Sequence, residues 1–389
     1  MTGLHFDRAE YEKRIARARG LLGERGLGAL LVFAPESHYY LTGYDSTGYL
    51  FFQAALLCAD DEPIVLLTRR PDLQQAKETS VITDIRIWYN AEDANPALDL
   101  RAIMDEKGLA GERVGIELDT YGMTGAVHEQ VRQAMDGWCR LEDASDLVRG
   151  MRAVKSPAEI ACVRRSAKLA DDALLAMLEA CGPGVLDTTV TAAGLSAILD
   201  GGGDVPPAGP LVNAGPRALY GRSVCSAQRI GDADQVTIEF AASFHRYTAC
   251  LMRTAVVGRS NPWQEEMFTV TTEALAAMTE AARPGRPLGE IDDAHRRVFD
   301  TAGHRLSRYS ACGYSLGATY RPSWMDVPPM LFSGNRTSAK PGMVLFLHAM
   351  LPDAERGLAM SAGYTILITD TGCEVLSQVP LEYPLVGVP

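Results

Sequence analysis

The residues best suited to chemistry lie at the ends of two apolar strands predicted in the second half of the chain. Glu239 is the second-last residue of the run 235–240, and His348 is the last residue of the run 343–348. A carboxylate in such a place can bind a cation, act as a base or serve as a nucleophile, and histidine titrates near neutral pH. The alternatives are an ion pair of Glu239 with Arg253 and a core His348 hydrogen-bonded to backbone. We treat both residues as candidate catalytic groups.

Cys250 belongs to the next predicted strand, 247–257. It would be a nucleophile if His348 lay beside it, because the thiolate is the reactive form, but a buried free cysteine is the commoner case. A single zinc ion on Cys250, His348 and Glu239 is chemically conceivable, since all three are permitted zinc ligands. Five further histidines show no pairing at metal-ligand spacing, and we expect them to be surface or structural: His5, His38, His128, His295 and His304.

Helices and strands alternate in the first half of the chain, which predicts an α/β layer domain over residues 1–152. The pattern of residues 10–26 is typical of an amphipathic helix that ends at glycine, and residues 27–33 form a buried strand. Residues 54–59 and 63–68 are predicted to form a hairpin. A further short strand is expected at residues 114–118.

The second domain, residues 153–389, begins with a helix start signal. Ser156 can cap the helix, Pro157 suits its first position, and Glu159 completes a capping box. Helical spacing of apolar residues then continues to about residue 182. Helices followed by strands predict an α+β domain. The remaining expected helices span about 187–200, 262–282 and 287–302, and the remaining expected strands span 235–240, 247–257, 343–348 and 364–369.

Composition limits the classes of function. The chain has 389 residues and a formal net charge of −12 without a Lys/Arg-rich stretch, so nucleic acid is an unfavourable partner. No apolar run reaches the roughly 18 residues that span a bilayer, and the start resembles no signal peptide, so we expect a cytoplasmic protein that does not contact membranes. Eight widely spaced cysteines without a C-x-x-C pair are expected to be reduced thiols.

Short motifs in a fixed order connect the second domain to a known family. The sequence resembles the creatinase/prolidase/aminopeptidase P superfamily, and this resemblance implies a pita-bread fold for residues 153–389 and a creatinase-like N-terminal domain for residues 1–152. The matching motifs are Tyr40-Leu41-Thr42-Gly43-Tyr44-Asp45 in the first half, then Lys155-Ser156-Pro157-Ala158-Glu159-Ile160, Gly231-Asp232, Met252-Arg253-Thr254, Gly313-Tyr314-Ser315-Leu316-Gly317, Lys340-Pro341-Gly342-Met343-Val344 and Thr365-Ile366-Leu367-Ile368-Thr369.

The resemblance also shows what this chain lacks. Metallopeptidases of the superfamily hold two divalent ions with two Asp, one His and two Glu, because two dications need several anionic oxygen ligands. The corresponding positions here are Glu239, Cys250, Tyr314, His348 and Gly363. We therefore expect no dinuclear metal site and no cofactor. The chain is similar to the metal-free branch that contains creatinase-like and ectoine-hydrolase-like enzymes.

Further candidate residues follow from the resemblance. Tyr220 falls where creatinase has its proton-transfer histidine; a phenol with a pKa near 10 is a poor base unless a cation such as Arg222 lowers it. Tyr314 either stabilises charge at the substrate or fills the vacated metal pocket. Arg321, close to Trp324, falls in a region that supplies an arginine for a substrate carboxylate in creatinase-like enzymes.

The aromatic side chains of the first half are the last candidates. The family is mostly homodimeric, with the N-terminal domain leaning over the partner's pocket, so a homodimer is expected here. Tyr44, Tyr49 and Phe52 then line substrate, or else belong to the core or to the dimer interface.

The function that we predict is metal-independent hydrolysis or cleavage of a C–N bond in a small, polar, amino-acid-like molecule. Glu239, His348 and Tyr220 form the catalytic set. The alternatives are a biosynthetic lyase, cyclase or isomerase, and a silent binding protein. A buried Glu239–His348 pair with perturbed pKa values favours catalysis, whereas a pocket filled by Tyr220 and Tyr314 favours a silent scaffold. Peptidase activity with manganese or cobalt is the least favoured enzymatic alternative.

Overall fold

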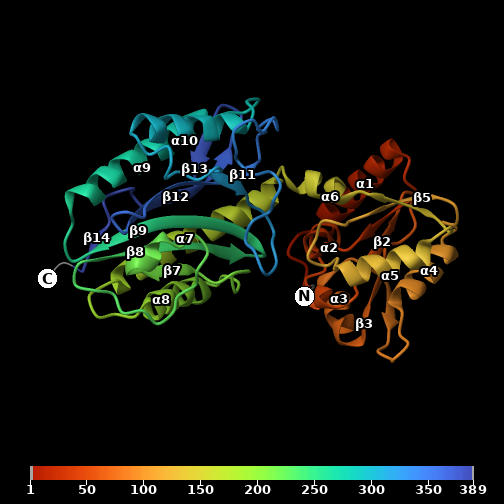
Figure 1. Cartoon of the computed structure of the whole chain (residues 1–389). Helices are drawn as coiled ribbons and strands as arrows, with labels where there is room; N and C mark the ends of the chain where they lie inside the picture. The colour runs from red at the N-terminus through yellow and green to blue at the C-terminus, as the bar shows by residue number, and fades with distance from the viewer. Residues whose placement is uncertain (1–2, 388–389) are drawn as a thin grey trace. The chain divides into compact units, whose positions relative to one another are not determined.

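Two compact units make up the computed structural model of the chain, which describes residues 3–387. They are Met1–Arg152 and Ala153–Pro389. Figure 1 traces the chain through both units. Within the described residues, no helix has the length and apolar character needed to cross a bilayer.

The N-terminal unit is a six-stranded sheet with the order β4-β3-β2-β1-β5-β6. Apolar residues of α4 and α5 cover one face, and those of α1, α2, α3 and α6 cover the other. Its elements are α1 (Arg8–Arg25), β1 (Ala29–Val32), α2 (Pro35–Thr42), η1 (Gly48–Leu50), β2 (Ala54–Cys58), β3 (Val65–Arg69), η2 (Arg70–Asp72), α3 (Leu73–Thr79), β4 (Asp84–Trp88), α4 (Pro96–Glu106), β5 (Arg113–Ile116), α5 (Gly125–Met135), β6 (Arg140–Asp143) and α6 (Ser145–Arg152).

The C-terminal unit is an eight-stranded sheet with the order β10-β11-β12-β9-β8-β7, to which β13 adds beside β12 and β14 beside β9. Its elements are α7 (Pro157–Ala180), α8 (Asp187–Asp200), β7 (Leu211–Ala214), η3 (Gly215–Leu219), β8 (Asp234–Phe244), β9 (Tyr247–Val257), α9 (Pro262–Ala281), α10 (Gly289–Thr301), β10 (Gly313–Ser315), β11 (Val344–Asp353), β12 (Leu358–Ile368), β13 (Cys373–Val375) and β14 (Leu385–Val386).

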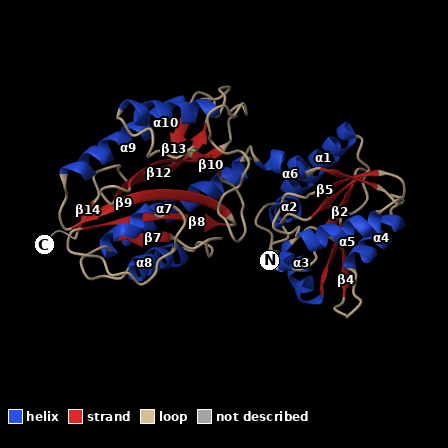
Figure 2. Ribbon diagram, in the orientation of Figure 1, coloured by secondary structure: helices blue, strands red, loops and turns tan. Residues whose placement is uncertain are grey.

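Local signals explain how the second unit begins. The predicted capping box is present: the Ser156 hydroxyl accepts the Glu159 N–H, and the Glu159 carboxylate accepts the Ser156 N–H at 2.8 Å. The cap satisfies N–H groups that have no partner within α7. Apolar residues of α7 then pack on β8 and β9, while those of α9 and α10 pack on β11 and β12. Figure 2 shows the strands of this unit between α9 and α10 on one side and α7 and α8 on the other.

Candidate active site

Strand alternation places the candidate residues on the sheet face that the helices do not cover. Val236, Ile238 and Phe240 of β8 pack with α7 and α8. Successive side chains of a strand point to opposite faces, so Glu239 points to the uncovered face. Leu345 and Leu347 of β11 likewise pack with α9 and α10. We call the uncovered side the inner face.

The strand register brings the other candidates to this same face. Glu239 lies opposite Met252 of β9, and Cys250 follows two positions away in the same pairing. His348 of β11 lies opposite Gly363 of β12, which in turn pairs with Met252. Tyr314 pairs with Phe346 at the sheet edge. Residues more than 100 positions apart in the sequence therefore share one surface.

Glu239 is the centre of the site. Glu239 is only 8% exposed, and one of its carboxylate oxygens accepts a hydrogen bond from the Tyr314 hydroxyl at 3.3 Å. The Trp324 indole N–H donates to the same hydroxyl at 2.7 Å. Burial raises the pKa of Glu239 to about 7, while the Tyr314 hydrogen bond and the charge of Arg222 lower it by less. A carboxyl group with this pKa exists in both protonation states near neutral pH.

Arg253 does not form the ion pair that was the alternative interpretation of Glu239. Its guanidinium donates to the backbone oxygens of Met252 and Gly363, at 2.7 and 2.9 Å. The reason is register: Arg253 pairs with Ile238, so it lies on the opposite face from Glu239. Burial lowers the pKa of this guanidinium to about 10.

Cys250 is fully enclosed next to Glu239 and Tyr314. Its backbone N–H and carbonyl both bond to the Thr365 hydroxyl, at 2.8 and 3.0 Å. Burial and the nearby Glu239 raise the pKa of the thiol well above its usual value, against a smaller lowering by Tyr314. These surroundings favour the neutral thiol, so they do not activate Cys250 as a nucleophile.

His348 lies beyond the tyrosine ring. The centroids of its ring and the Tyr314 ring are 5.9 Å apart, and the Phe346 ring lies 5.5 Å away. Burial of the imidazole and the proximity of His295 lower the pKa of His348 to about 3. The imidazole is therefore neutral at physiological pH, and the Tyr314 side chain contacts both Glu239 and His348.

The remaining predicted residues of this unit lie on loops. Tyr220 is 51% exposed, and its ring is 5.2 Å from the Arg217 guanidinium carbon. Arg222 is exposed and close enough to lower the pKa of Glu239. Arg321 is also exposed, whereas the neighbouring Trp324 is buried. The structure thus joins Trp324 and Arg222 to the Glu239 site and leaves Tyr220 on its loop, where a catalytic role stays a prediction.

The aromatic residues of the N-terminal unit are packed in its core. Tyr44 is 1% exposed and its hydroxyl accepts a hydrogen bond from Gln53 at 2.8 Å. Phe52 makes an edge-on contact with Phe33, with centroids 5.6 Å apart, and Tyr49 is also buried. This packing supports the core alternative for Tyr44 and Phe52, and contact of Tyr49 with substrate stays a prediction.

The inner face does not fit a pair of divalent ions. Of the five positions that correspond to the superfamily's ligands, only Glu239 carries a carboxylate. At Gly363 an added Cβ would lie 2.8 Å from the Phe346 ring and 2.7 Å from the Leu347 carbonyl oxygen. The Phe346 ring thus occupies the space that a ligand side chain at 363 would need. Too few anionic oxygens remain to offset two dications.

Sequence reasoning missed two features of this domain. Phe346 is two positions before His348 on the same strand, so period-two alternation could have placed it on the inner face. His295 was expected to be surface or structural, without metal-ligand spacing. It is buried close to Asp292 and Cys312, which fits the structural alternative but adds a grouping of three potential ligands that was not expected. Its i, i+3 spacing from Asp292 on a predicted helix was the available signal.

Comparison with known proteins identifies the family. Residues 161–370 match metallopeptidase family M24, which is more than half of the chain. This chain belongs to metallopeptidase family M24. Residues 14–154 of the M24 protein match the creatinase/prolidase N-terminal domain. The predicted superfamily and the predicted pairing of an α/β domain with a pita-bread domain are therefore confirmed.

Several relatives match nearly the whole length of this M24 protein. It is 28% identical to an ectoine hydrolase from Halomonas elongata over 98% of both chains. It is 27% identical to an uncharacterized hydrolase/peptidase from Sinorhizobium fredii, over 98% of this chain and 99% of the relative. A prolidase structure from Thermococcus sibiricus superimposes with a TM-score of 0.87 at 20% identity, covering 97% and 99% of the two chains, which shows the shared fold.

Proposed function

We propose that this M24 protein is a metal-independent hydrolase that cleaves a C–N bond in a small, polar, amino-acid-like substrate. The observation that carries the proposal is the buried Glu239 carboxyl with a pKa near 7, placed where the superfamily has a metal ligand. Its hydrogen bond from Tyr314 is part of the same arrangement. The likeness to an ectoine hydrolase over the full length of both chains supports the same reaction class.

Glu239 supplies the proton transfers of this reaction. As a carboxylate it removes a proton from water while the water oxygen bonds to the substrate carbon, and as the acid it returns that proton to the leaving nitrogen when the C–N bond breaks. A pKa near the working pH suits both steps, because neither protonation state is costly to reach.

Tyr314 and His348 stabilise charge in this proposal. The indole of Trp324 donates to the Tyr314 oxygen, so the hydroxyl proton of Tyr314 is free to point at Glu239 or at an oxygen that becomes negative on the substrate. Neutral His348 can donate or accept one hydrogen bond at the substrate. Arg222 lies near enough to attract a substrate carboxylate, and Arg321 and Tyr220 are further candidates for binding.

Turnover without added metal tests the proposal. We would incubate the chelator-treated protein with ectoine, creatine and Xaa-Pro dipeptides, each with and without Mn²⁺ or Co²⁺, and detect products by NMR. We expect the chelator-treated protein to hydrolyse an ectoine- or creatine-type compound, so that neither Mn²⁺ nor Co²⁺ is required. Glu239→Gln should lower kcat by about 10²- to 10⁴-fold, the usual contribution of a general acid–base residue.

A matched control is Glu266→Gln, which changes an exposed glutamate of α9 and should leave kcat unchanged. Dipeptide hydrolysis that depends on Mn²⁺ or Co²⁺ would contradict the proposal. So would an unchanged kcat in Glu239→Gln.

A silent binding protein is the second candidate, because the Tyr314 ring packs against Phe346 and its hydroxyl already satisfies Glu239. Thermal stabilisation by a small amino acid or betaine, together with no turnover of any compound in the panel, would favour this candidate. Glu239→Gln would then weaken ligand binding without any catalytic effect to measure.

A further inference from the structure

A second group of chemically active side chains lies outside the inner face, between α10 and the start of β10. Asp292 and His295 are three positions apart on α10, and Cys312 directly precedes β10. One ligand atom from each residue lies within 4.8 Å of the other two. The residues are 0%, 1% and 0% exposed. A carboxylate, an imidazole and a thiol are the side-chain types that bind zinc.

Two atoms of this group have no hydrogen-bond partner within residues 3–387. The Asp292 Oδ2 atom accepts the Ser333 N–H at 2.9 Å and lies 3.3 Å from the Arg296 Nε atom. The Oδ1 atom and the His295 Nδ1 atom lie 3.4 Å apart, within ion-pair distance, but neither makes a hydrogen bond. The Cys312 thiol also interacts with the Asp292 carboxylate. Buried polar atoms are almost always paired. A cation bound by both atoms would account for the exception.

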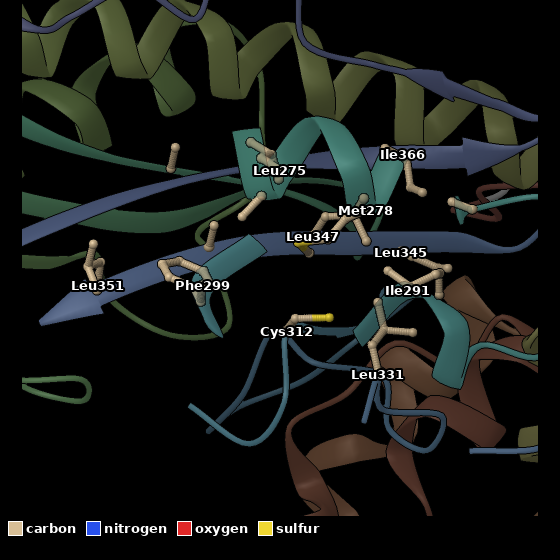
Figure 3. Packing of buried hydrophobic residues seen from close by; sticks show 14 of the residues in the cluster. Leu275, Met278, Ile291, Phe299, Cys312, Leu331, Leu345, Leu347, Leu351 and Ile366 are labelled. Carbon is tan, nitrogen blue, oxygen red and sulfur yellow. The ribbon is translucent and has the colours of Figure 1, made fainter. Parts of the chain in front are cut away.

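The surroundings are those of a closed site. Figure 3 shows the Cys312 sulfur among the apolar side chains of Leu331, Leu345 and Leu347, and the Phe299 side chain belongs to the same cluster. Apolar walls strengthen the attraction between a cation and its anionic ligands by excluding water. Burial of this kind is typical of structural zinc sites, although those usually have four protein ligands; three protein ligands with a water molecule are the set usual at sites with an open position.

We propose that Asp292, His295 and Cys312 bind one zinc-type divalent ion, with a water molecule as the fourth ligand. Zinc bonds of roughly 2.0–2.3 Å in a tetrahedron place ligand atoms about 3.5 Å apart. The Asp292 Oδ1 and His295 Nδ1 atoms already have this spacing, and no ligand-atom distance in the group exceeds 4.8 Å. The three ligands differ from the inner-face positions, although Asp292 and His295 lie close enough to His348 to affect its pKa. The proposal does not rest on the proposed hydrolase activity.

The ion would connect α10 to β10, the strand that carries Tyr314. Tyr314 is two residues after Cys312, and the Cys312 carbonyl accepts the His348 N–H at 2.9 Å. Metal binding therefore fixes the backbone on which Tyr314 and His348 depend. Its expected role is positioning, because binding free energy at a closed site becomes folding free energy.

Cobalt titration of the metal-stripped full-length protein tests the site. Co²⁺ bound to a thiolate gives a charge-transfer band in the near ultraviolet, and tetrahedral Co²⁺ gives intense visible bands. We expect one equivalent of Co²⁺ to produce both sets of bands and one equivalent of Zn²⁺ to abolish them. Cys312→Ser should lose the charge-transfer band. Asp292→Asn should weaken affinity by more than about 100-fold, since even loss of an outer-shell partner costs about 10- to 100-fold.

The matched control is Cys181→Ser, which removes another buried free cysteine of the same unit and should keep the band. Circular dichroism of each variant separates loss of the site from loss of the fold, and Asp292→Asn provides a second variant of the same size. A wild-type protein without the band would overturn the proposal. A band retained in Cys312→Ser but lost in Cys250→Ser or Glu239→Gln would also overturn it, because the ion would then lie on the inner face.

Discussion

Burial and two neighbouring residues act on the proton of Glu239 in opposite directions. Burial disfavours the carboxylate, whereas the Tyr314 hydroxyl and the Arg222 charge favour it. Burial has the largest effect, so the folded protein retains this proton to a higher pH than the unfolded chain does. The same imbalance that suits Glu239 to proton transfer therefore reduces stability at neutral pH.

Replacing Glu239 should make stability less dependent on pH. The shift from 4.5 to about 7 corresponds to about 3 kcal/mol at 1.36 kcal/mol per pKa unit. Below pH 4.5 Glu239 is protonated in both the folded protein and the unfolded chain. As the pH rises from 4.5 to 7, Glu239 ionises in the unfolded chain but stays protonated in the folded protein, and this ionisation stabilises the unfolded chain. Glu239→Gln has no ionisable group at this position, so its stability does not fall as the pH rises. Relative to wild type, it should gain up to about 3 kcal/mol of unfolding free energy between low pH and pH values above 7.

Urea unfolding of the C-terminal unit at pH 4.5 and pH 8 tests this effect. The measured quantity is the difference in unfolding free energy between wild type and Glu239→Gln, which should change between the two pH values. Tyr314→Phe is the companion variant: it removes the hydrogen bond that lowers the pKa of Glu239, so the pH dependence should extend to higher pH. If the difference in unfolding free energy between wild type and Glu239→Gln is the same at both pH values, the pKa of the Glu239 carboxyl is not raised in the folded protein.

At the scale of elements, five strands form the inner face through register and alternation. β8 supplies Glu239, β9 Cys250, β10 Tyr314 and β11 His348, while β12 contributes a glycine that leaves room for Phe346. A one-residue slip of any strand would turn its candidate side chain toward the helices. The packing of Phe346 over Gly363 helps to exclude such a slip between β11 and β12.

Gly363→Ala should destabilise the C-terminal unit by about 1–3 kcal/mol, the range for overpacking a tight site. The added methyl group would lie 2.7 Å from the Leu347 carbonyl oxygen, which a paired strand cannot easily move. Gly372→Ala is the control, because a Cβ there meets no atom within 4 Å. Thermal unfolding of both variants would show whether the Gly363 change is the more damaging, and equal melting temperatures would contradict this account.

At the scale of the whole molecule, the two units have separate apolar cores. The two core clusters on either face of the N-terminal sheet contain only residues up to Met151, and those of the C-terminal sheet begin at Ala153. α6 belongs to the N-terminal unit because Leu147, Val148 and Met151 pack into its core. The expected homodimer and a role for Tyr49 across its interface stay predictions.

Residues 1–152 should therefore fold cooperatively when expressed alone, and residues 1–144 should not. The shorter fragment loses three buried side chains, each of which contributes about 1.5–3 kcal/mol. That loss approaches the whole stability of a typical domain. Circular dichroism and urea unfolding of the two fragments test this expectation. Equal stability of both fragments would show that α6 is not part of this core.

The predicted helices and strands agree closely with the structure because each had strong local signals. The Ser156–Glu159 capping box and the apolar spacing after it predicted the start of α7, and the two strands 235–240 and 247–257 proved to be the core of the β8–β9 hairpin. Such signals depend on nearby residues along the chain. The loss of the dinuclear ligand set could also be inferred from the resemblance alone.

Sequence alone determined the residue types at the inherited positions, the superfamily and the fold class, since these depend on composition, order and short-range pattern. Only the tertiary structure decided that Tyr314 lies between Trp324 and Glu239, that Arg253 faces away from Glu239, and that His295 meets Cys312. These contacts join segments far apart in the chain. Burial and strand register, which set both the contacts and the pKa values, arise only when those segments pack together.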